Sequence, residues 1–386
     1  MNRILRSALI FALLGAAASA RADITIGIDL STTGSAAAIG IPSKNAVQLW
    51  PDQIGGQKAR YIILDDATDP TNAVTNVKKL IADERVDAIV GPNITPSAIA
   101  VIDAVSEGQT PLVALAASAA IIEPQSDPRR KWVFKMPQND ALMVTAVTEH
   151  MRRAGIKTLG FIGFNDAYGE SWAKELTALV EKQGVKLVAN ERFVRTDTSV
   201  TGQILKIMST KPDAVFIAAS GTPAALPQRT LVERGYAGKI YQTHGIATPD
   251  FLRVAGKEAE NTLFPTGPSV VAADLPDSHP VKKAAVDFVN RYEKAYGVGT
   301  STQFAADAWG AWQLLDDATG RALKTGAKPG TVEFRRALRD ALESTANLTV
   351  PNGVLNLSAK DHQGFDERAR VMGVVKNGKF TYAAEQ

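Results

Sequence analysis

The chain has 386 residues, no cysteine, and 43 basic against 40 acidic residues, which gives a net charge of +3. Charge this balanced provides no electrostatic footprint for nucleic acid or an anionic membrane, and a chain without cysteine forms no disulfides. The length exceeds what one hydrophobic core usually serves, so we expect two domains that are stabilised by core burial alone.

Residues 1–20 have the pattern of a secretory signal peptide. Arg3 and Arg6 precede a short apolar run at 8–14, and Ala18-Ser19-Ala20 is a small-residue cleavage site. That apolar run is too short to span a bilayer, and no later segment is long and apolar enough to do so. We therefore expect an exported protein that is cleaved after Ala20.

Short apolar runs alternate with helical patterns along the first two thirds of the chain. Strands are predicted at 24–30, 61–64, 88–90, 111–115, 132–135, 158–162, 186–194, 214–218 and 240–243. Helices are predicted at 42–50, 73–82, 139–154, 170–183, 199–209 and 224–234. This alternation favours parallel sheets covered by helices, and its restart near residue 132 favours two similar α/β units.

The alternation lapses after Leu263. Helical patterns follow at 281–296, 302–322 and 331–342, and residues 354–379 indicate short strands with Gly and Asn turns. Two α/β units with added helices suggest two lobes separated by a cleft. Ligands of such sheets bind outside the carboxyl ends of the strands, so the strand ends of both lobes are expected to face the cleft.

The stretch from Val90 to Ser97 has the pattern of a strand end, a tight turn and a helix start. Thr95 is a candidate N-cap and Pro96 suits the first helical position. A threonine hydroxyl with free backbone amides at a strand end suits a carboxylate. The alternative is that Thr95 only caps the helix. Ser118 favours a site, because it is a second hydroxyl that follows the neighbouring strand.

Two further strand ends carry candidate contacts from the second unit. Tyr168 follows the strand at 158–162, where it either lies on the surface or stacks on a ligand in the cleft. His244 follows the strand at 240–243, where it either makes a structural hydrogen bond or contacts the ligand. The residues alone leave both alternatives open.

The sequence lacks the common catalytic and cofactor patterns. None of the four histidines stands at metal-ligand spacing from another, and there is no Walker loop, no G-x-G-x-x-G after the first strand and no nucleophile elbow. We therefore expect no catalytic residue, no metal and no cofactor, and a binding function in place of an enzymatic one.

Four stretches resemble the leucine/isoleucine/valine-binding proteins, the type I periplasmic solute-binding components of ABC transporters. They are Asp65-Asp66-x-x-Asp69-Pro70, Val90-Gly91-Pro92, Ala116-Ala117-Ser118 and Asn165-Asp166-x-Tyr168-Gly169-Glu170. The resemblance covers nearly all of 23–386. It implies two Rossmann-like lobes on a three-segment hinge, with residues 21–138 and 268–349 in lobe 1 and residues 139–267 and 350–386 in lobe 2.

The resemblance also implies roles for individual residues on the first lobe. Thr95 matches a serine that binds the ligand carboxylate, and Ser118 matches a threonine that assists it. Ala116 offers a carbonyl that accepts from the ligand ammonium in amino-acid binders, and Ile39 matches a wall position. Ile94 is also a predicted ligand contact. In some members of the family, a disulfide joins the positions that Thr68 and Ile94 match.

Other positions depart from the family pattern. Tyr168 matches an aromatic wall, but His244 matches the glutamate that pairs with the α-ammonium, and a neutral histidine supplies no negative charge. Ser220 and Gly221 stand where a tyrosine closes the pocket and leave more room. Phe304 is either a ring contact or a core residue. This pattern resembles the relatives that bind aromatic acids of the benzoate, hydroxybenzoate or cinnamate type.

The expected function is that of a monomeric periplasmic binding protein that closes like a hinge on a small carboxylate and delivers it to ABC permease subunits in the inner membrane. One alternative is a binder of branched-chain or other hydrophobic amino acids. The second is a ligand-sensing lobe for a receptor.

Overall fold

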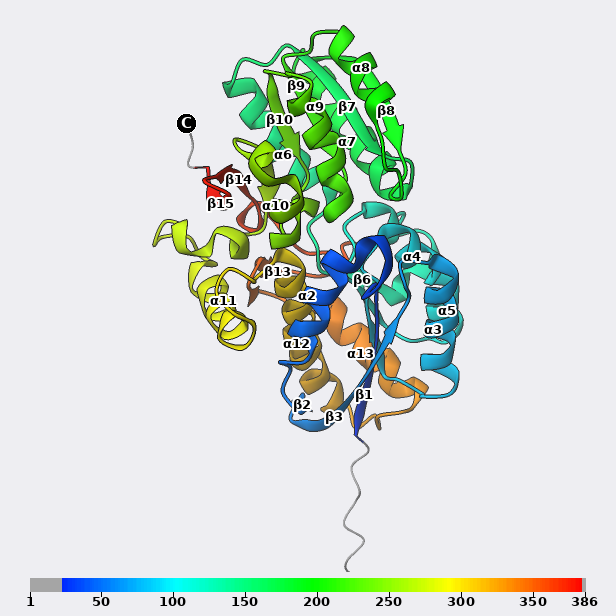
Figure 1. The fold of residues 1–386 in the computed structure, drawn as a ribbon. Coiled ribbons are helices and arrows are strands. Elements are labelled where there is room, and N and C mark those ends of the chain that lie inside the picture. Colours follow the sequence, from blue (N-terminus) through cyan, green and yellow to red (C-terminus); the bar gives the residue numbers. More distant parts are fainter. Residues whose placement is uncertain (1–22, 384–386) are drawn as a thin grey trace, which may run out of the picture.

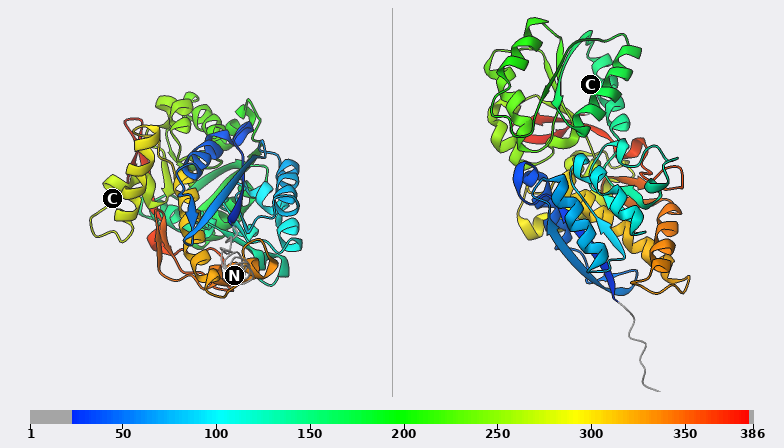
Figure 2. Two further views of the ribbon diagram at one scale, coloured as in Figure 1. Left: turned by 90° about the horizontal axis from the view of Figure 1, so that it is seen from below. Right: turned by 90° about the vertical axis from the view of Figure 1, so that its right-hand side faces the viewer.

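The computed structural model describes residues 23–383 as two lobes stacked one on the other (Figure 1). Each lobe has its own sheet with helices on both faces, and the division between the lobes is also visible in the right-hand view of Figure 2. The predicted two-lobe α/β fold class is confirmed. The predicted signal peptide and its cleavage site lie outside the described residues.

The first sheet has six strands, five of them parallel. In spatial order they are β2 (Gln53–Ile54), β3 (Gln57–Asp65), β1 (Ile24–Leu30), β4 (Ala88–Val90), β5 (Leu112–Ala114) and β6 (Val133–Lys135). Only β2 is antiparallel to its neighbour. The direction of chain order reverses between β1 and β4, and such a switch point is where α/β sheets bind ligands.

The second sheet has seven strands and repeats this order. In space it runs β15 (Lys379–Tyr382), β14 (Val371–Lys376), β11 (Leu263–Thr266), β10 (Lys239–Gln242), β9 (Ala214–Ala218), β7 (Thr158–Phe164) and β8 (Lys186–Phe193). Strands β7 to β11 are parallel, and β14 and β15 add an antiparallel edge. The switch point here lies between β7 and β9. A small hairpin of β12 (Leu348–Val350) and β13 (Gly353–Leu355) stands apart from both sheets.

Helices cover both faces of the first sheet. They are α2 (Ala37–Val47), α3 (Pro70–Ala82), α4 (Thr95–Ala100), α5 (Ile102–Glu107), α11 (Lys282–Tyr296), α12 (Gln303–Leu323) and α13 (Val332–Glu343). Alternate residues of β4 serve different cores, because successive strand side chains point to opposite faces. Ile89 packs with α3 to α5, whereas Ala88 and Val90 pack with α2 and α11 to α13.

The second sheet is enclosed by α6 (Asp140–Arg153), α7 (Ala167–Lys182), α8 (Thr201–Ser209), α9 (Ala225–Glu233) and α10 (Pro249–Ala255). Trp172 of α7 is fully buried in this core, with its ring centroid 5.3 Å from that of Phe216 on β9. Because all five parallel strands run the same way, their carboxyl ends meet at the edge that faces the first lobe (Figure 1).

Strands β2 and β12 and helix α10 have no counterpart in the sequence-based prediction, and two further elements also differ from it. The helix predicted at 42–50 begins five residues earlier, at Ala37, and contains Pro42 inside it. The prediction placed the proline at a helix start, where its missing N–H is harmless, but packing of α2 against α12 overrides this preference. Strand β11 was not predicted; it is short, and Pro265 within it cannot donate to a neighbouring strand.

The chain passes between the two lobes three times, after β6, after β11 and after β13. The boundaries near 138 and 267 stay predictions, but the third, predicted at 350, is too early. Leu355 and Leu357 belong to the core of the first lobe, and His362 stacks on Phe134 of β6 at 4.2 Å between ring centroids. We place the third passage after Phe365, where the chain leaves this core for β14.

A buried polar network connects the three passages. Gln303 Oε1 accepts hydrogen bonds from Gly267 N (2.9 Å) and Thr266 Oγ1 (3.0 Å), and Gln303 Nε2 donates to Gln138 Oε1 at 2.8 Å. Gln138 Nε2 donates in turn to the Ala369 carbonyl at 2.8 Å. Buried polar groups are stable only when paired, so these side chains hold the passages in register.

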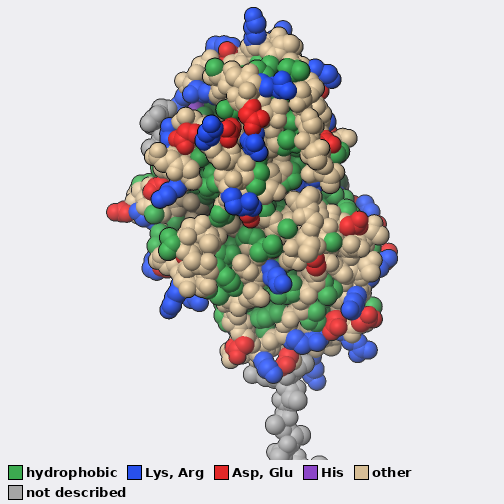
Figure 3. Space-filling view, in the orientation of Figure 1, with side chains coloured by type: hydrophobic (Ala, Val, Ile, Leu, Met, Phe, Trp, Pro, Cys, Tyr) green, Lys and Arg blue, Asp and Glu red, His purple; other side chains and the backbone are tan. Residues whose placement is uncertain are grey.

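Charge on the surface is mixed, as the composition predicts. Basic and acidic side chains are intermixed over the face shown in Figure 3, and ion pairs such as Lys283–Asp287 lie exposed on the surface. Within residues 23–383, none of the helices combines the length and the apolar character that crossing a bilayer requires.

The polar network generates a stability prediction. Gln303→Leu leaves the Gly267 N–H, the Thr266 hydroxyl and the Gln138 amide short of partners, and one such buried loss costs about 1–3 kcal/mol. We expect the free energy of unfolding, measured by urea denaturation, to fall by at least about 2 kcal/mol. The control is Gln313→Leu on the same helix, whose Oε1 has no partner among the described residues. An equal loss in both variants would contradict a role for the network.

Candidate functional site

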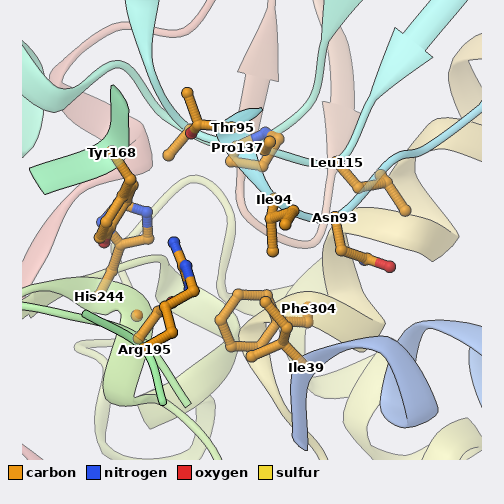
Figure 4. A pocket seen from close by; sticks show the side chains of 14 residues that line it. Ile39, Asn93, Ile94, Thr95, Leu115, Pro137, Tyr168, Arg195, His244 and Phe304 are labelled. Carbon is orange, nitrogen blue, oxygen red and sulfur yellow. The ribbon is translucent and has the colours of Figure 1, made fainter. Parts of the chain in front are cut away.

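A cavity lies between the lobes at the carboxyl ends of both sheets (Figure 4). From the first lobe it is lined by residues 93–95 after β4, residues 115–117 after β5, and Pro137 after β6. From the second lobe it is lined by Tyr168, Arg195, Ser220 and residues 244–245, which follow β7, β8, β9 and β10. Strand direction therefore brings seven separate loops to one place.

The cavity is small. Its volume is about 20 Å³, whereas pockets that hold small ligands usually have about 300–1,000 Å³. The structure is therefore a closed form of the cleft, and a ring-sized ligand requires the lobes to part before it enters.

Thr95 lines the cavity, but it does not cap its helix as predicted. The residue before α4 is Ile94, which makes no side-chain capping bond, and Thr95 is already helical. Thr95 is 1% exposed, and its Oγ1 has no hydrogen-bond partner within residues 23–383. A buried hydroxyl without a partner is costly, so this atom is available to a ligand.

The turn before Thr95 depends on a glycine. Gly91 has a φ of +98°, and a Cβ placed on it would come within 1.9 Å of the Asp29 carbonyl oxygen. No L-amino acid with a side chain fits this approach. The close contact between the end of β4 and the end of β1 therefore sets the position of residues 93–95.

The loop after β5 contributes Ala116 but not Ser118. Ala116 lines the cavity, whereas the Ser118 hydroxyl accepts a hydrogen bond from Ala120 N at 3.2 Å and starts a short 3-10 helix. Ser118 is fully buried and does not line the described cavity. Its predicted contact with a carboxylate stays a prediction for another conformation of the cleft.

One wall of the cavity is apolar. Ile39 from α2, Ile94, and Phe304 from the first turn of α12 pack together with Ala36 in a cluster of their own. All three line the cavity, and Figure 4 shows Phe304 and Ile39 next to each other. Phe304 is thus a packed residue that also lines the cavity, and its contact with a ligand ring stays a prediction.

Tyr168 presents its ring to the cavity while its hydroxyl is engaged elsewhere. The hydroxyl donates to Thr243 Oγ1 at 2.8 Å, and Thr243 Oγ1 donates to the Ala219 carbonyl at 2.8 Å. Burial raises the pKa of Tyr168, and the charge of Asp140 adds to that effect. The ring is therefore a neutral, fixed surface suited to stacking.

His244 lies beside Tyr168 at the same end of the cavity (Figure 4). It is 3% exposed, and its ring centroid is 5.7 Å from that of Trp172. Burial lowers its pKa to about 3, with a smaller contribution from the charge of Lys135. A ring desolvated in this way stays neutral near neutral pH.

The sequence analysis missed Arg195, the one cation among the described residues that line the cavity. Its Nε donates to Asp166 Oδ2 at 2.7 Å, and its Nη1 donates to Ser220 Oγ at 3.2 Å. The signal was available, because Arg195 follows a predicted strand as the other lining residues do. Five further lining residues were also not predicted: Asn93, Leu115, Ala117, Pro137 and Gly245.

Ser220 and Gly221 differ in what they contribute. Ser220 lines the cavity and accepts the bond from Arg195. Gly221 does not line it; a Cβ on Gly221 would lie 3.8 Å from both Ala38 and Ile39 of the opposite lobe. Gly221 is therefore a point of close contact between the lobes in this closed form.

The chemistry that this arrangement supports is binding. The lining residues from the described part of the chain include no aspartate and no glutamate. Residues 23–383 also contain no group of three or more histidine, aspartate or glutamate side chains placed to hold a metal ion. What the cavity offers is a cation, a free hydroxyl, a neutral imidazole and an apolar wall.

Comparisons with known proteins agree with this description. A family model described as periplasmic binding protein matches residues 23–379. The chain is 24% identical over 348 residues to Leu/Ile/Val-binding protein homolog 3 of Brucella melitensis, across 88% of this chain and 90% of that protein. That relative is a binding protein by name.

Solved structures share the fold over most of the chain. An extracellular ligand-binding receptor from Rhodopseudomonas palustris HaA2 is 43% identical, with a TM-score of 0.90 over 94% of this chain and 100% of that one. A solute-binding protein of an ABC transporter from R. palustris, in complex with benzoate, is 22% identical, with a TM-score of 0.79 over 94% and 96%. The second likeness shows the fold alone. The chain belongs to the periplasmic binding protein family, as a type I member of the leucine/isoleucine/valine-binding kind.

Proposed function

We propose that this protein is the extracytoplasmic solute-binding component of an ABC importer and that it captures a small aromatic carboxylate of the benzoate, hydroxybenzoate or cinnamate type. It is exported to the periplasm, acts as a monomer, and passes its ligand to permease subunits in the inner membrane. The proposed ligand contacts are Thr95, Ala116, Tyr168, His244, Ile39, Ile94, Ser220 and Phe304, all of which line the cavity.

One observation carries the proposed ligand class: the described lining residues include a cation and no carboxylate. An α-amino acid brings an ammonium group that loses its water in a closed cleft. Burying that charge without an anionic partner costs several kcal/mol. An aromatic acid has no such group, and its ring suits the wall of Ile39, Ile94 and Phe304.

A second candidate is a branched-chain or other hydrophobic amino acid, which the name of the Brucella relative favours for that protein. In this chain the Ala116 carbonyl is an acceptor for an ammonium, but it carries no charge. His244 is neutral and adds no charge either. A sensing lobe for a receptor is the remaining alternative, and it would use the same cavity.

The first prediction from this proposal concerns Thr95. Thr95→Val keeps the shape and removes only the hydroxyl, so affinity for the cognate carboxylate should fall by about 1.5–3 kcal/mol. Stability should not fall, because the hydroxyl has no partner within the described residues. Thr319→Val is the control; its buried hydroxyl on α12 is also unpartnered there. Calorimetry showing equal affinity in both variants would remove Thr95 from the site.

The second prediction concerns ligand class. Calorimetry should show that 4-hydroxybenzoate binds at least ~100-fold more tightly than leucine, on the order of 3 kcal/mol. His244→Glu should narrow this gap, because it restores an anion for an ammonium and repels an electron-rich phenolic oxygen. If the unmodified protein binds leucine with micromolar affinity and does not bind aromatic acids, the ligand is an amino acid and the proposed ligand class is wrong.

The third prediction concerns motion. Because the cavity is closed in the structure, the free protein should open about the three passages and then close on a ligand. Small-angle scattering should give a smaller radius of gyration with saturating 4-hydroxybenzoate than without it. The same radius in both samples would argue against hinge closure.

A further inference from the structure

Arg195 is held in place by three independent contacts. Its Nε donates to Asp166 Oδ2 at 2.7 Å, its Nη1 donates to Ser220 Oγ at 3.2 Å, and its guanidinium carbon lies 4.0 Å from the centre of the Phe164 ring. The side chain is only 12% exposed. A guanidinium fixed on one edge and one face has little freedom left to lose when it binds a ligand.

Asp166, which orients Arg195, is itself fixed by the backbone. Its Oδ1 accepts hydrogen bonds from Tyr168 N at 2.9 Å and Gly169 N at 3.2 Å, so it caps α7. The same carboxylate therefore starts the helix that carries Tyr168 and aims the guanidinium. Asp166 therefore fixes the positions of both Tyr168 and Arg195, so the position of one relative to the other does not depend on a flexible side chain.

The contacts leave part of the guanidinium unused. Arginine has five N–H donors, and two of them are engaged by Asp166 and Ser220. Figure 4 shows the end of Arg195 extending into the cavity from the second lobe, with Thr95 on the opposite side. Thr95 Oγ1 is likewise without a partner among the described residues. Two free donors from different lobes thus face one enclosed space.

We propose that Arg195 is the residue that selects for anionic ligands, and that the ligand carboxylate bridges Arg195 of the second lobe and Thr95 of the first. This inference rests on the proposed function of the cleft and assigns its charge selectivity to one residue. A carboxylate in this place accepts a charge-assisted bond from the guanidinium and a bond from the threonine hydroxyl. Because it contacts both lobes, its binding also stabilises the closed form.

The same placement explains why an ammonium is excluded. A cationic group at this end of the cavity meets the guanidinium and a neutral His244, with no free carboxylate among the lining residues. Like charges in a dry cleft repel because little water remains to screen them, and the pairing of Arg195 with Asp166 weakens this repulsion without supplying a free carboxylate to an ammonium. Arg195 therefore acts twice, as an attractive partner for anions and as a repulsive element against amino acids.

The test compares an acid with its amide. Calorimetry with 4-hydroxybenzoate and 4-hydroxybenzamide measures the preference for the charged group, because the two ligands have nearly the same shape. The unmodified protein should prefer the acid by ~100-fold. In Arg195→Met this preference should fall below ~5-fold, and in Arg195→Lys it should be intermediate, since lysine keeps the charge but not the planar fork.

Arg192 provides a matched control. It lies on β8, pairs with Glu170 at 2.5 Å, and stacks over Phe161 at 5.0 Å, but it does not line the cavity. Arg192→Met should retain the full preference for the acid. Thermal unfolding of each variant checks that it is folded.

The outcomes separate this inference from the proposed function. Suppose that the unmodified protein binds the acid and that Arg195→Met keeps the same preference for the acid over the amide. The role of Arg195 is then overturned, and the proposed ligand class stands. If the unmodified protein binds leucine in place of the acid, both are overturned. A loss of preference in Arg195→Met and in Arg192→Met alike would show a general effect of charge on the lobe and would also overturn the role.

Discussion

The parallel pairing of strands in two separate sheets is the constraint on which the cleft depends. Parallel strands end at a common edge, and both sheets turn that edge toward each other. Residues far apart in the chain, such as Thr95 and His244, consequently meet in one cavity. The loops themselves are short, so their positions follow from where the strands stop. Strand β8 belongs to the same arrangement, which is why Arg195 reaches the cavity although it lies outside the recognised motifs.

Desolvation decides what the cavity can bind. Groups that titrate or donate freely in water behave differently once the lobes exclude it. His244 remains neutral because burial lowers its pKa to about 3. Thr95 has a hydroxyl with no partner among the described residues, and Arg195 keeps unused donors despite its pairing with Asp166. Under the proposed function, a carboxylate gains partners in such a place, whereas an ammonium loses its water and meets only the uncharged Ala116 carbonyl. We therefore propose that charge, more than shape, separates the two ligand classes that the family resemblance leaves open.

The buried polar network joins the three chain segments that pass between the two lobes. Gln138 of the first passage donates to the Ala369 carbonyl of the third, and Gln303 and Asn352 accept from the Gly267 and Ser269 amides of the second. Buried hydrogen bonds of this kind are directional, so they limit how the lobes can move relative to each other. The third passage lies later than the sequence indicated, because residues up to Phe365 stay on the first lobe. In the proposed hinge motion, this network is expected to keep the strand ends opposed.

The sequence alone determined the two-lobe α/β class, most strands, and the residues of the recognised motifs, because hydrophobic periodicity and strand-end chemistry are local signals. It placed Thr95, Ala116, Tyr168, His244 and Phe304 as candidates, and all of them line one cavity. It misplaced the start of α2, missed β11, and interpreted Thr95 as a cap. It also missed Arg195. Those points were decided only by tertiary structure, because burial, the pairing of Arg195 with Asp166, and the approach of two lobes arise from residues distant in the chain.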